Sequence, residues 1–245
     1  FSKGILSINF AGEKQAYIPE AKETLDLLVA KATARYGDSP SSKVWNGEGS
    51  WSKDGQFNLV CSRQSLIRLL EEEYGMEQGT GPEKCLPKRL LIGKSENQIA
   101  FLQALYGGDG TLLEHPDAEE KEVMLATSSP RMASGVQAML ALYGITSRIT
   151  WSHPEGRKNP QAQIHVRNQQ QRRFTSLVGF KCNPPKEEEI REILNREELQ
   201  REHEPRNPTV TAIVPDGHEE TYDISEPETR SFIANGFISH NCNLS

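Results

Sequence analysis

The chain of 245 residues repeats one pattern of strand, helix and glycine, and this repeat limits its fold more than any other feature. In the first copy, a strand pattern at 6–10 precedes a helical pattern at 19–36 that stops at Gly37. A strand pattern at 56–61 then precedes a helical pattern that stops at Gly75, 38 residues further on (75 − 37). Glycine ends helices because it adopts the left-handed backbone conformation without strain.

The second copy has the same order. Its strand patterns lie at 123–127 and 161–166, and the helical patterns after them stop at Gly144 and Gly179, 35 residues apart (179 − 144). A helical pattern at 96–107 precedes this copy, whereas the counterpart of that helix in the first copy would precede residue 1. The repeat predicts a mixed α/β (α+β) fold with two similar halves, and it predicts that the chain begins inside a repeat.

The distribution of charge changes what the total charge implies. With 28 Lys and Arg against 34 Asp and Glu, the formal charge is −6, whereas nucleic-acid-binding domains usually carry a basic excess. Residues 81–183, however, hold 13 basic and 9 acidic side chains (+4), and residues 184–245 hold 6 and 14 (−8). The middle segment is therefore the part that favours contact with nucleic acid.

Other features concern the cellular compartment. No run of 18 apolar residues exists, so no membrane association is predicted, and the first residues do not resemble a signal peptide. The four cysteines lie far apart without a CxxC pair, which predicts reduced thiols and neither a disulfide framework nor a zinc ribbon. We expect a cytoplasmic protein.

The helix at 96–107 carries the first candidate for chemistry. Ser95 and Gln98 have the spacing of a capping box at its start. Its end reads FLQALYGGDG (101–110), in which small residues let a second helix approach and Asp109 supplies a carboxylate. A carboxylate beside a backbone carbonyl offers the hard oxygen ligands that Mg²⁺ prefers. The alternative is that Asp109 only forms part of a turn.

Three segments around this helix together resemble one family. LQALYGGDG (102–110) resembles the motif of the LAGLIDADG, or DOD-type, homing endonucleases. Upstream, KCLP (84–87) resembles the Lys-x-Ile-Pro block that precedes the second motif copy in intein endonucleases. Downstream, TSSPRMASGVQAMLALYGITSRI (127–149) resembles the strand and helix that follow the motif. The resemblance covers residues 1–190.

This resemblance implies two pseudo-symmetric αββαββ halves, with the motif helices packed at the centre and a saddle-shaped antiparallel sheet on double-stranded DNA. It implies that Asp109 binds Mg²⁺ at the scissile phosphate, with the Gly108 carbonyl as a second ligand. By position, Lys84 is the basic residue of the first half, and Lys186 is that of the second half, with Lys181 as its rival. Each lysine can also be an ordinary solvated charge.

Several arginines of the basic segment are candidates for contact with DNA phosphates or guanine edges. They are Arg131, Arg148, Arg167, Arg172 and Arg173. Two alternatives to an active nuclease stay open: a degenerate remnant that binds DNA without cutting it, and a splicing scaffold without nuclease activity. The first motif copy, with its acidic ligand, is absent, so we expect cleavage to need an N-terminal partner that supplies it.

The C-terminal segment TYDISEPETRSFIANGFISHNC (221–242) resembles the C-terminal splicing blocks of inteins. The side-chain amide of Asn241 can attack its own carbonyl and break the bond to Cys242, whose thiolate is the acyl acceptor. His240 can polarise that carbonyl, and Asp223 matches the acid of the family's block. Arg230 stands where many inteins carry histidine.

The last residues, CNLS (242–245), resemble a stretch of ribonucleotide reductase large chains, the expected host protein. The N-terminal splicing half is expected in the same N-terminal intein fragment as the first motif. The resulting division comprises a first endonuclease half without its motif helix, a second LAGLIDADG half, a connector helix, the β strands of a C-terminal Hint (intein) splicing region, and host residues. These correspond to 1–83, 84–185, 186–204, 205–241 and 242–245.

Overall fold

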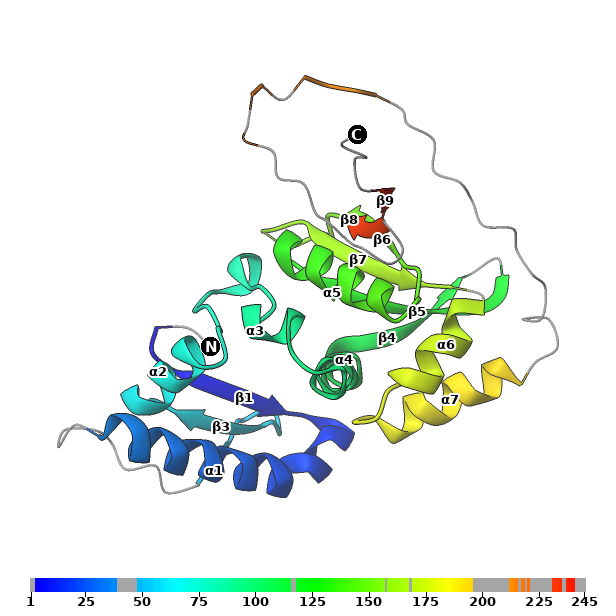
Figure 1. Ribbon diagram of the computed structural model, residues 1–245. Helices are drawn as coiled ribbons and strands as arrows, with labels where there is room; N and C mark the ends of the chain where they lie inside the picture. Colours follow the sequence, from blue (N-terminus) through cyan, green and yellow to red (C-terminus); the bar gives the residue numbers. More distant parts are fainter. Residues whose placement is uncertain are drawn as a thin grey trace. The chain divides into compact units, whose positions relative to one another are not determined.

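The computed structural model describes residues 3–38, 48–115, 118–156, 158–167, 169–195, 212–215, 217, 218, 220, 231–234 and 237–240. The chain forms two compact units, Phe1–Leu199 and Gln200–Ser245. The first unit contains two antiparallel sheets with helices and is a mixed α/β fold (Figure 1). Within the described residues, no helix is long and apolar enough to cross a membrane.

The first half of this unit is a three-stranded sheet with order β1-β3-β2, and all its pairs are antiparallel. Helices α1 and α2 pack against each other, and their buried side chains share a core with the sheet. A 3-10 helix, η1, joins β1 to α1. The elements are β1 (Leu6–Phe10), η1 (Gly12–Tyr17), α1 (Ile18–Tyr36), β2 (Ser50–Trp51), β3 (Phe57–Cys61) and α2 (Gln64–Glu72).

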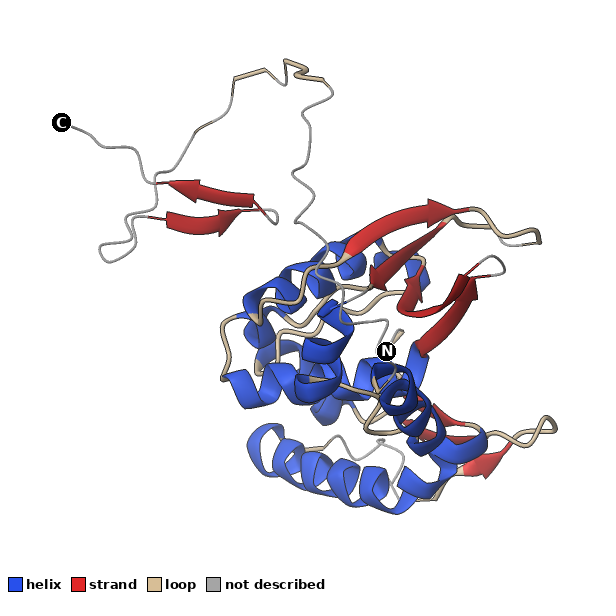
Figure 2. Cartoon of the chain, turned by 90° about the vertical axis from the view of Figure 1, so that its right-hand side faces the viewer, coloured by secondary structure: helices blue, strands red, loops and turns tan. Residues whose placement is uncertain are grey.

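The second half is a four-stranded antiparallel sheet with order β4-β5-β7-β6. A 3-10 helix, η2 (Gly81–Glu83), and helix α3 (Lys88–Leu91) lead into it. Figure 2 shows helices gathered on one side of the sheet. The elements are α4 (Ser95–Asp109), β4 (Gly110–His115), β5 (Ala118–Thr127), α5 (Pro130–Leu142), β6 (Arg148–Ser152), β7 (Gln161–Val166), α6 (Gln169–Leu177) and α7 (Pro184–Leu194).

The two faces of the four-stranded sheet differ in polarity. Val123 and Leu125 of β5 pair with Val166 and Ile164 of β7, and these four side chains are buried in the helix-covered core. Side chains alternate between the faces of a strand, so the residues between them point to the opposite face. That face carries Gln161, Gln163 and His165 of β7, with Arg148, Thr150 and Ser152 opposite them on β6.

The four glycines that mark the repeat all have the predicted backbone conformation. Gly37, Gly75, Gly144 and Gly179 have φ angles of 67°, 66°, 66° and 64°. Only glycine adopts this left-handed region at little cost, which explains why each repeat ends its helices at this residue type. The predicted mixed α/β fold is confirmed, with antiparallel sheets of three and four strands.

The copies differ on one side of their sheets. In the second half, β5 lies between β4 and β7, whereas in the first half its counterpart β1 has β3 on one side and is an edge strand among the described residues. Helix α4 and strand β4 therefore have no counterpart in the described part of the first half. The repeat is incomplete on the side of β1.

Three details of the sequence prediction need correction. Residue Ser95 does not cap α4: the N-cap is Lys94, and the amide of Gln98 donates instead to the carbonyls of Leu90 and Leu91, at 2.9 and 3.0 Å. Asp109 lies in the last turn of α4, because the helix runs two residues beyond the predicted end. Strands β2, β4 and β6 were not marked by the strand patterns.

The second unit contains a hairpin of β8 (Ser231–Ala234) and β9 (Phe237–His240). Its backbone pairing places Ser231 opposite His240. Asp223, Asn241 and Cys242 lie outside the described residues.

Two adjacent glycines of α4 provide a matched stability test. A methyl group at Gly107 would lie 2.8 Å from Cβ and 2.9 Å from the backbone nitrogen of Cys182, whereas at Gly108 it would meet nothing within 4 Å. We expect Gly107→Ala to lower the free energy of unfolding by about 1–3 kcal/mol through overpacking. Gly108→Ala is expected to leave it unchanged or raise it by up to about 1 kcal/mol, because alanine favours helix. Urea unfolding of both variants checks this, and equal effects would contradict the close contact.

Candidate active site at the end of helix α4

Asp109 occupies an exposed position at the C-terminal end of α4. The next residue, Gly110, has extended backbone (φ −69°, ψ 155°) and starts β4, so the chain turns directly from helix to strand at the carboxylate. Tyr106, one turn earlier, is completely buried and anchors this end of the helix against Phe174. The carboxylate therefore projects from a fixed backbone.

Two lysines, one from each half, converge on this helix end. Lys14 of η1 donates to the carbonyl of Gly108, and Lys186 of α7 donates to the carbonyl of Gly110 at 2.5 Å. Positive charge is favourable here because the last carbonyls of a helix carry the negative end of its dipole. The two carbonyls flank Asp109, so both ammonium groups lie in its vicinity.

The position of Lys186 follows from the start of α7. Asn183 is the N-cap and accepts from the backbone nitrogen of Lys186 through its side chain, while Pro184 and Pro185 occupy the first helical positions. Burial lowers the pKa of Lys186 below its usual value, and the neighbouring charge of Lys14 lowers it further, against the opposing influence of Asp109. A larger fraction of this amine is therefore neutral than in an exposed lysine, and only the neutral amine can accept a proton.

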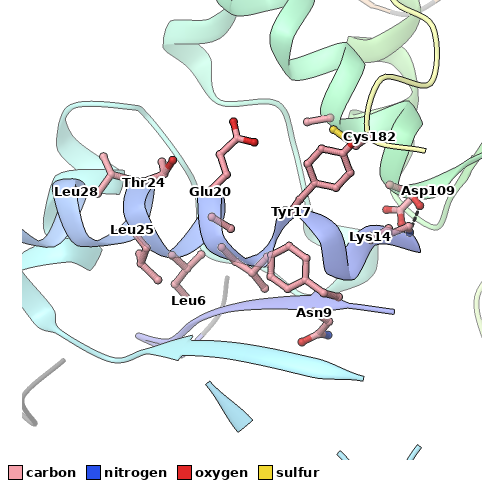
Figure 3. A pocket seen from close by; sticks show the side chains of 15 residues that line it. Leu6, Asn9, Lys14, Tyr17, Glu20, Thr24, Leu25, Leu28, Asp109 and Cys182 are labelled. Atoms are coloured by element: carbon pink, nitrogen blue, oxygen red, sulfur yellow. Dashed lines mark hydrogen bonds between the residues drawn. The ribbon is translucent and has the colours of Figure 1, made fainter. Parts of the chain in front are cut away.

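A pocket of about 450 Å³ opens beside Asp109. Figure 3 shows Lys14 and Asp109 close together at one end, with Leu25 and Leu28 of α1 further along. Most of the lining is apolar or small. It includes Leu6, Ile8 and Phe10 of β1, Leu25 and Leu28 of α1, and Ala104 and Gly108 of α4.

The oxygen atoms at the helix end suit a hard divalent cation. The carboxylate of Asp109 is exposed, and the Gly108 carbonyl lies next to it in the chain while also accepting from Lys14. Mg²⁺ commonly takes one or two protein carboxylates and completes its shell with water and phosphate oxygens. No group of three or more His, Cys, Asp or Glu side chains forms a metal cluster within the described ranges. The residues present thus fit one part of a Mg²⁺ site.

The other two candidate lysines lie elsewhere. Lys84 follows η2 with an exposed side chain, its carbonyl accepts from Ser129 at 2.5 Å, and it does not line the pocket. Lys181 forms an ion pair with Glu187 at 3.0 Å. Of the three lysines proposed from sequence, the structure brings only Lys186 to Asp109, and it adds Lys14, which lies in a 3-10 helix that no motif or repeat pattern marked.

Four of the five candidate arginines already have partners in the protein. Arg131 forms an ion pair with Glu77 at 3.0 Å, and hydrogen bonds from Arg131 and Lys88 lower the pKa of Glu77 to about 2. Arg167 pairs with the buried Glu122. The other two arginines donate to backbone carbonyls at helix ends. Arg172 donates to the carbonyl of Leu194 at 2.8 Å, and Arg173 donates to the carbonyl of Tyr143 at 2.5 Å.

Arg148 differs from these four. It is exposed, lies on the polar face of the second sheet opposite His165, and makes no ion pair with any residue that the structure describes. It is therefore the candidate arginine best placed to meet a ligand on that face.

Comparison with known proteins places the helix end inside a recognised domain. Residues 96–179 match the family model of the LAGLIDADG-like domain. This segment contains α4 with Asp109 and the polar sheet face, whereas Lys14 and Lys186 lie outside it.

Among curated proteins, the chain is 23% identical over 201 residues to the ribonucleoside-diphosphate reductase NrdEB subunit alpha of Bacillus subtilis and to its counterpart in Bacillus phage SPbeta. The match covers 76% of this chain and 18% of each relative, so the chain spans less than a fifth of their length.

Among solved structures, variants of the homing endonuclease I-DmoI are 17% identical, with a TM-score of 0.47, over 77% of this chain and 83% of theirs. I-DmoI in complex with DNA and calcium is 15% identical, with a TM-score of 0.44, over 78% and 83%. The homing endonuclease I-WcaI bound to its DNA recognition sequence is 12% identical, with a TM-score of 0.44, over 76% and 74%.

Proposed function

We propose that this chain is the C-terminal part of an intein that contains a metal-dependent DNA endonuclease of LAGLIDADG type. The observation that carries the nuclease proposal is the convergence of Lys14 and Lys186 on the helix end that bears Asp109, inside the segment that matches the LAGLIDADG-like model. A carboxylate with two lysine side chains beside it suits phosphodiester hydrolysis, because that reaction develops negative charge on phosphate oxygens and needs a base for the attacking water.

Each residue has a distinct role in this proposal. Asp109 and the Gly108 carbonyl would hold Mg²⁺, which would supply Lewis-acid stabilisation of the charge that develops on phosphate oxygens. Lys14, held by the Gly108 carbonyl, lies where it can stabilise the charge of the phosphate. Lys186, whose pKa is lowered by burial, can accept a proton from the attacking water.

The polar face of the second sheet is the proposed DNA contact. Gln161 and Gln163 lie two residues apart on β7, and Arg148 of β6 lies on the same face, opposite His165. Side chains two residues apart on a strand are separated by about 7 Å, which is close to two base-pair steps of B-DNA. Amide and guanidinium groups at this spacing suit the donor and acceptor pattern of the major groove.

A helix followed by a strand is the proposed N-terminal partner of the nuclease half. The pocket beside α4 has the apolar side chains of β1 and α1 on one side and the small residues Ala104 and Gly108 on the other. The adjoining edge of β1 corresponds to the edge of β5 that β4 occupies. A second copy of the α4–β4 pair would fill the pocket with its helix, extend the sheet with its strand, and bring the second acidic ligand.

Enlarging one residue of this pocket tests the docking. We expect Ala104→Phe to weaken association with the N-terminal intein segment by about tenfold or more, because the added ring occupies the space of the incoming helix. Ala138→Phe, at an exposed alanine of α5 outside the pocket, is the matched control. Isothermal titration with the N-terminal segment measures both variants, and equal affinities would remove the pocket from the docking site.

The splicing proposal rests on the sequence at the end of the hairpin. Strand β9 ends at His240, directly before the proposed reactive pair Asn241 and Cys242. After the acyl group has moved to the Cys242 thiolate, the Asn241 side-chain nitrogen attacks its own backbone carbonyl. A succinimide forms and the peptide bond to the Cys242 nitrogen breaks, while Asp223 and His240 assist proton transfer. The similarity to ribonucleotide reductase chains supports that protein as host.

One assay separates the nuclease from its alternatives. The chain, assembled with the N-terminal intein segment, is used to select a binding site from random duplex DNA, and Mg²⁺ is then added to the selected complex. We expect nicking of both strands. Binding without nicking would support the degenerate remnant, and failure to bind any duplex at low salt would support the splicing scaffold. Efficient sequence-specific cleavage by the chain alone would contradict the need for a partner.

A further inference from the structure

A buried pair of ionisable residues lies on the polar face of the second sheet. Glu122 of β5 and His165 of β7 have exposures of only 2% and 5%, although neither belongs to the apolar core. Such a pair is costly to bury unless every polar atom is hydrogen-bonded. The nuclease chemistry proposed at Asp109 makes no use of it.

Hydrogen bonds connect this pair to the surface of the sheet. Oε1 of Glu122 lies 2.7 Å from Nδ1 of His165, and Nε2 of His165 lies 2.8 Å from Oγ1 of Thr150. The same hydroxyl lies 3.4 Å from Oε1 of Gln163, a half-buried side chain opposite Thr150 in the strand register. Four residues from three strands thus form one hydrogen-bond network.

The hydrogen bonds at the Glu122 end of this network have a fixed donor and acceptor. Burial acts to raise the pKa of Glu122, but the hydrogen bonds from Arg167 and His165 outweigh it and hold this pKa below its usual value. The ionised carboxylate can only accept, and Arg167 donates to its other oxygen, so Nδ1 of His165 must carry a proton and donate. The ring is therefore held in one orientation, with Nε2 toward Thr150.

The outer end is the amide of Gln163, which has a donor and an acceptor that can exchange places by rotation. The single hydroxyl proton of Thr150 points either toward His165 or toward Gln163. In the first case the hydroxyl can accept from the amide nitrogen, and in the second it donates to the amide oxygen. The structure has the second arrangement: the Thr150 hydroxyl donates to Oε1 of Gln163, so Nε2 of the amide faces away from Thr150.

We propose that Gln163 reads one base pair of the bound duplex, and that Glu122, His165 and Thr150 are positioning residues that fix the orientation of its amide. The inference rests on the proposed DNA contact of this face. A glutamine whose amide cannot rotate distinguishes base donors from acceptors in the major groove, whereas a freely rotating amide accepts either. Discrimination at that base pair therefore depends on the Thr150 hydroxyl, although Thr150 need not touch DNA.

The test uses the chain assembled with the N-terminal intein segment. It measures binding to the selected duplex and to duplexes in which each base pair is replaced in turn. We expect Gln163→Ala to reduce discrimination at one base pair by about tenfold, within the range of one good base contact. Thr150→Val, which removes the hydroxyl at nearly constant shape, is expected to reduce discrimination at that same base pair by a similar factor. Thr150→Ser, which keeps the hydroxyl, should retain wild-type discrimination at that base pair.

Two further variants sharpen the test. The double variant Thr150→Val with Gln163→Ala should lose no more discrimination at that base pair than Gln163→Ala alone, because the hydroxyl acts through the amide. Gln161→Ala should affect a different base pair, about two steps away. Nitrogen NMR of the imidazole provides a readout without DNA: we expect a proton on Nδ1 of His165 in the wild type.

The outcomes distinguish this inference from the proposed function. Unchanged discrimination in Thr150→Val, with wild-type thermal stability, would overturn the relay while leaving the DNA contact intact. Failure of the wild type to bind any duplex would overturn both the relay and the proposed DNA contact. A uniform loss of affinity at every base pair in Thr150→Val, without a change in discrimination, would show that Thr150 only supports the fold and would also overturn the relay.

Discussion

Replacement of Asp109 by asparagine is expected to abolish DNA nicking by the assembled intein, with a loss of at least about 10²-fold in rate. Asparagine has almost the same shape but no charge, so it retains the end of α4 and loses the strongest ligand for Mg²⁺. Binding of the selected duplex in calcium-free buffer should be unchanged, because the polar sheet face is not altered. Single-turnover nicking of a supercoiled plasmid measures the effect.

Glu114→Gln is the matched control for this loss. Glu114 is an exposed carboxylate on β4, five residues beyond Asp109, and it pairs with Lys121 at the surface. Its replacement removes the same charge from the same region without touching the helix end, so nicking should proceed at the wild-type rate. Nicking by Asp109→Asn at more than about a tenth of the wild-type rate would remove Asp109 from the metal site, because one lost ligand typically costs more.

Replacement of Asn241 by alanine is expected to eliminate cleavage of the bond between residues 241 and 242. Alanine has no side-chain nitrogen and cannot form the succinimide, so no slower version of the same step remains. With a reporter protein fused after Ser245, mass spectrometry of the assembled intein should detect no free reporter. Association of the two intein segments should be normal, which separates a chemical defect from a folding defect.

Asn243→Ala provides the control for the splicing variant, since Asn243 lies in the expected host segment and takes no part in the proposed step. Release of the reporter should continue in this variant. Reporter release from Asn241→Ala would instead exclude cyclisation as the cause of cleavage.

The sequence predicted the repeated architecture well because glycine and helix ends are local features. Gly37 and Gly179 take the left-handed conformation that their positions indicated, and the helix before Asp109 forms as expected. The capping box at Ser95 failed for a different reason. Nε2 of Gln98 donates to two carbonyls of α3, and its Oε1 accepts from the Tyr143 hydroxyl at 2.5 Å, so contacts from outside the helix override the local pattern.

The lysines and arginines show the limit of sequence reasoning more clearly. A sequence displays charges but not the partners that neutralise them. Arg131 and Arg167 are each held by a glutamate 45 or more residues away in the chain, and no local pattern marks such a pair. Lys14 was not predicted as a site residue because its partner is also distant in the sequence: it lies in a short 3-10 helix and donates to Gly108, 94 residues further along the chain.

The edge position of β1 has a consequence for how such a chain must be handled by a cell. Strand edges with free amide and carbonyl groups pair readily with other extended chains, and β1 joins such an edge to an apolar pocket. An unpaired edge of this kind can compete for any available β segment, including β1 of another copy. If the proposed N-terminal segment docks at this edge, faster capture of that segment would shorten the time during which aggregation competes, and would raise the yield of folded protein.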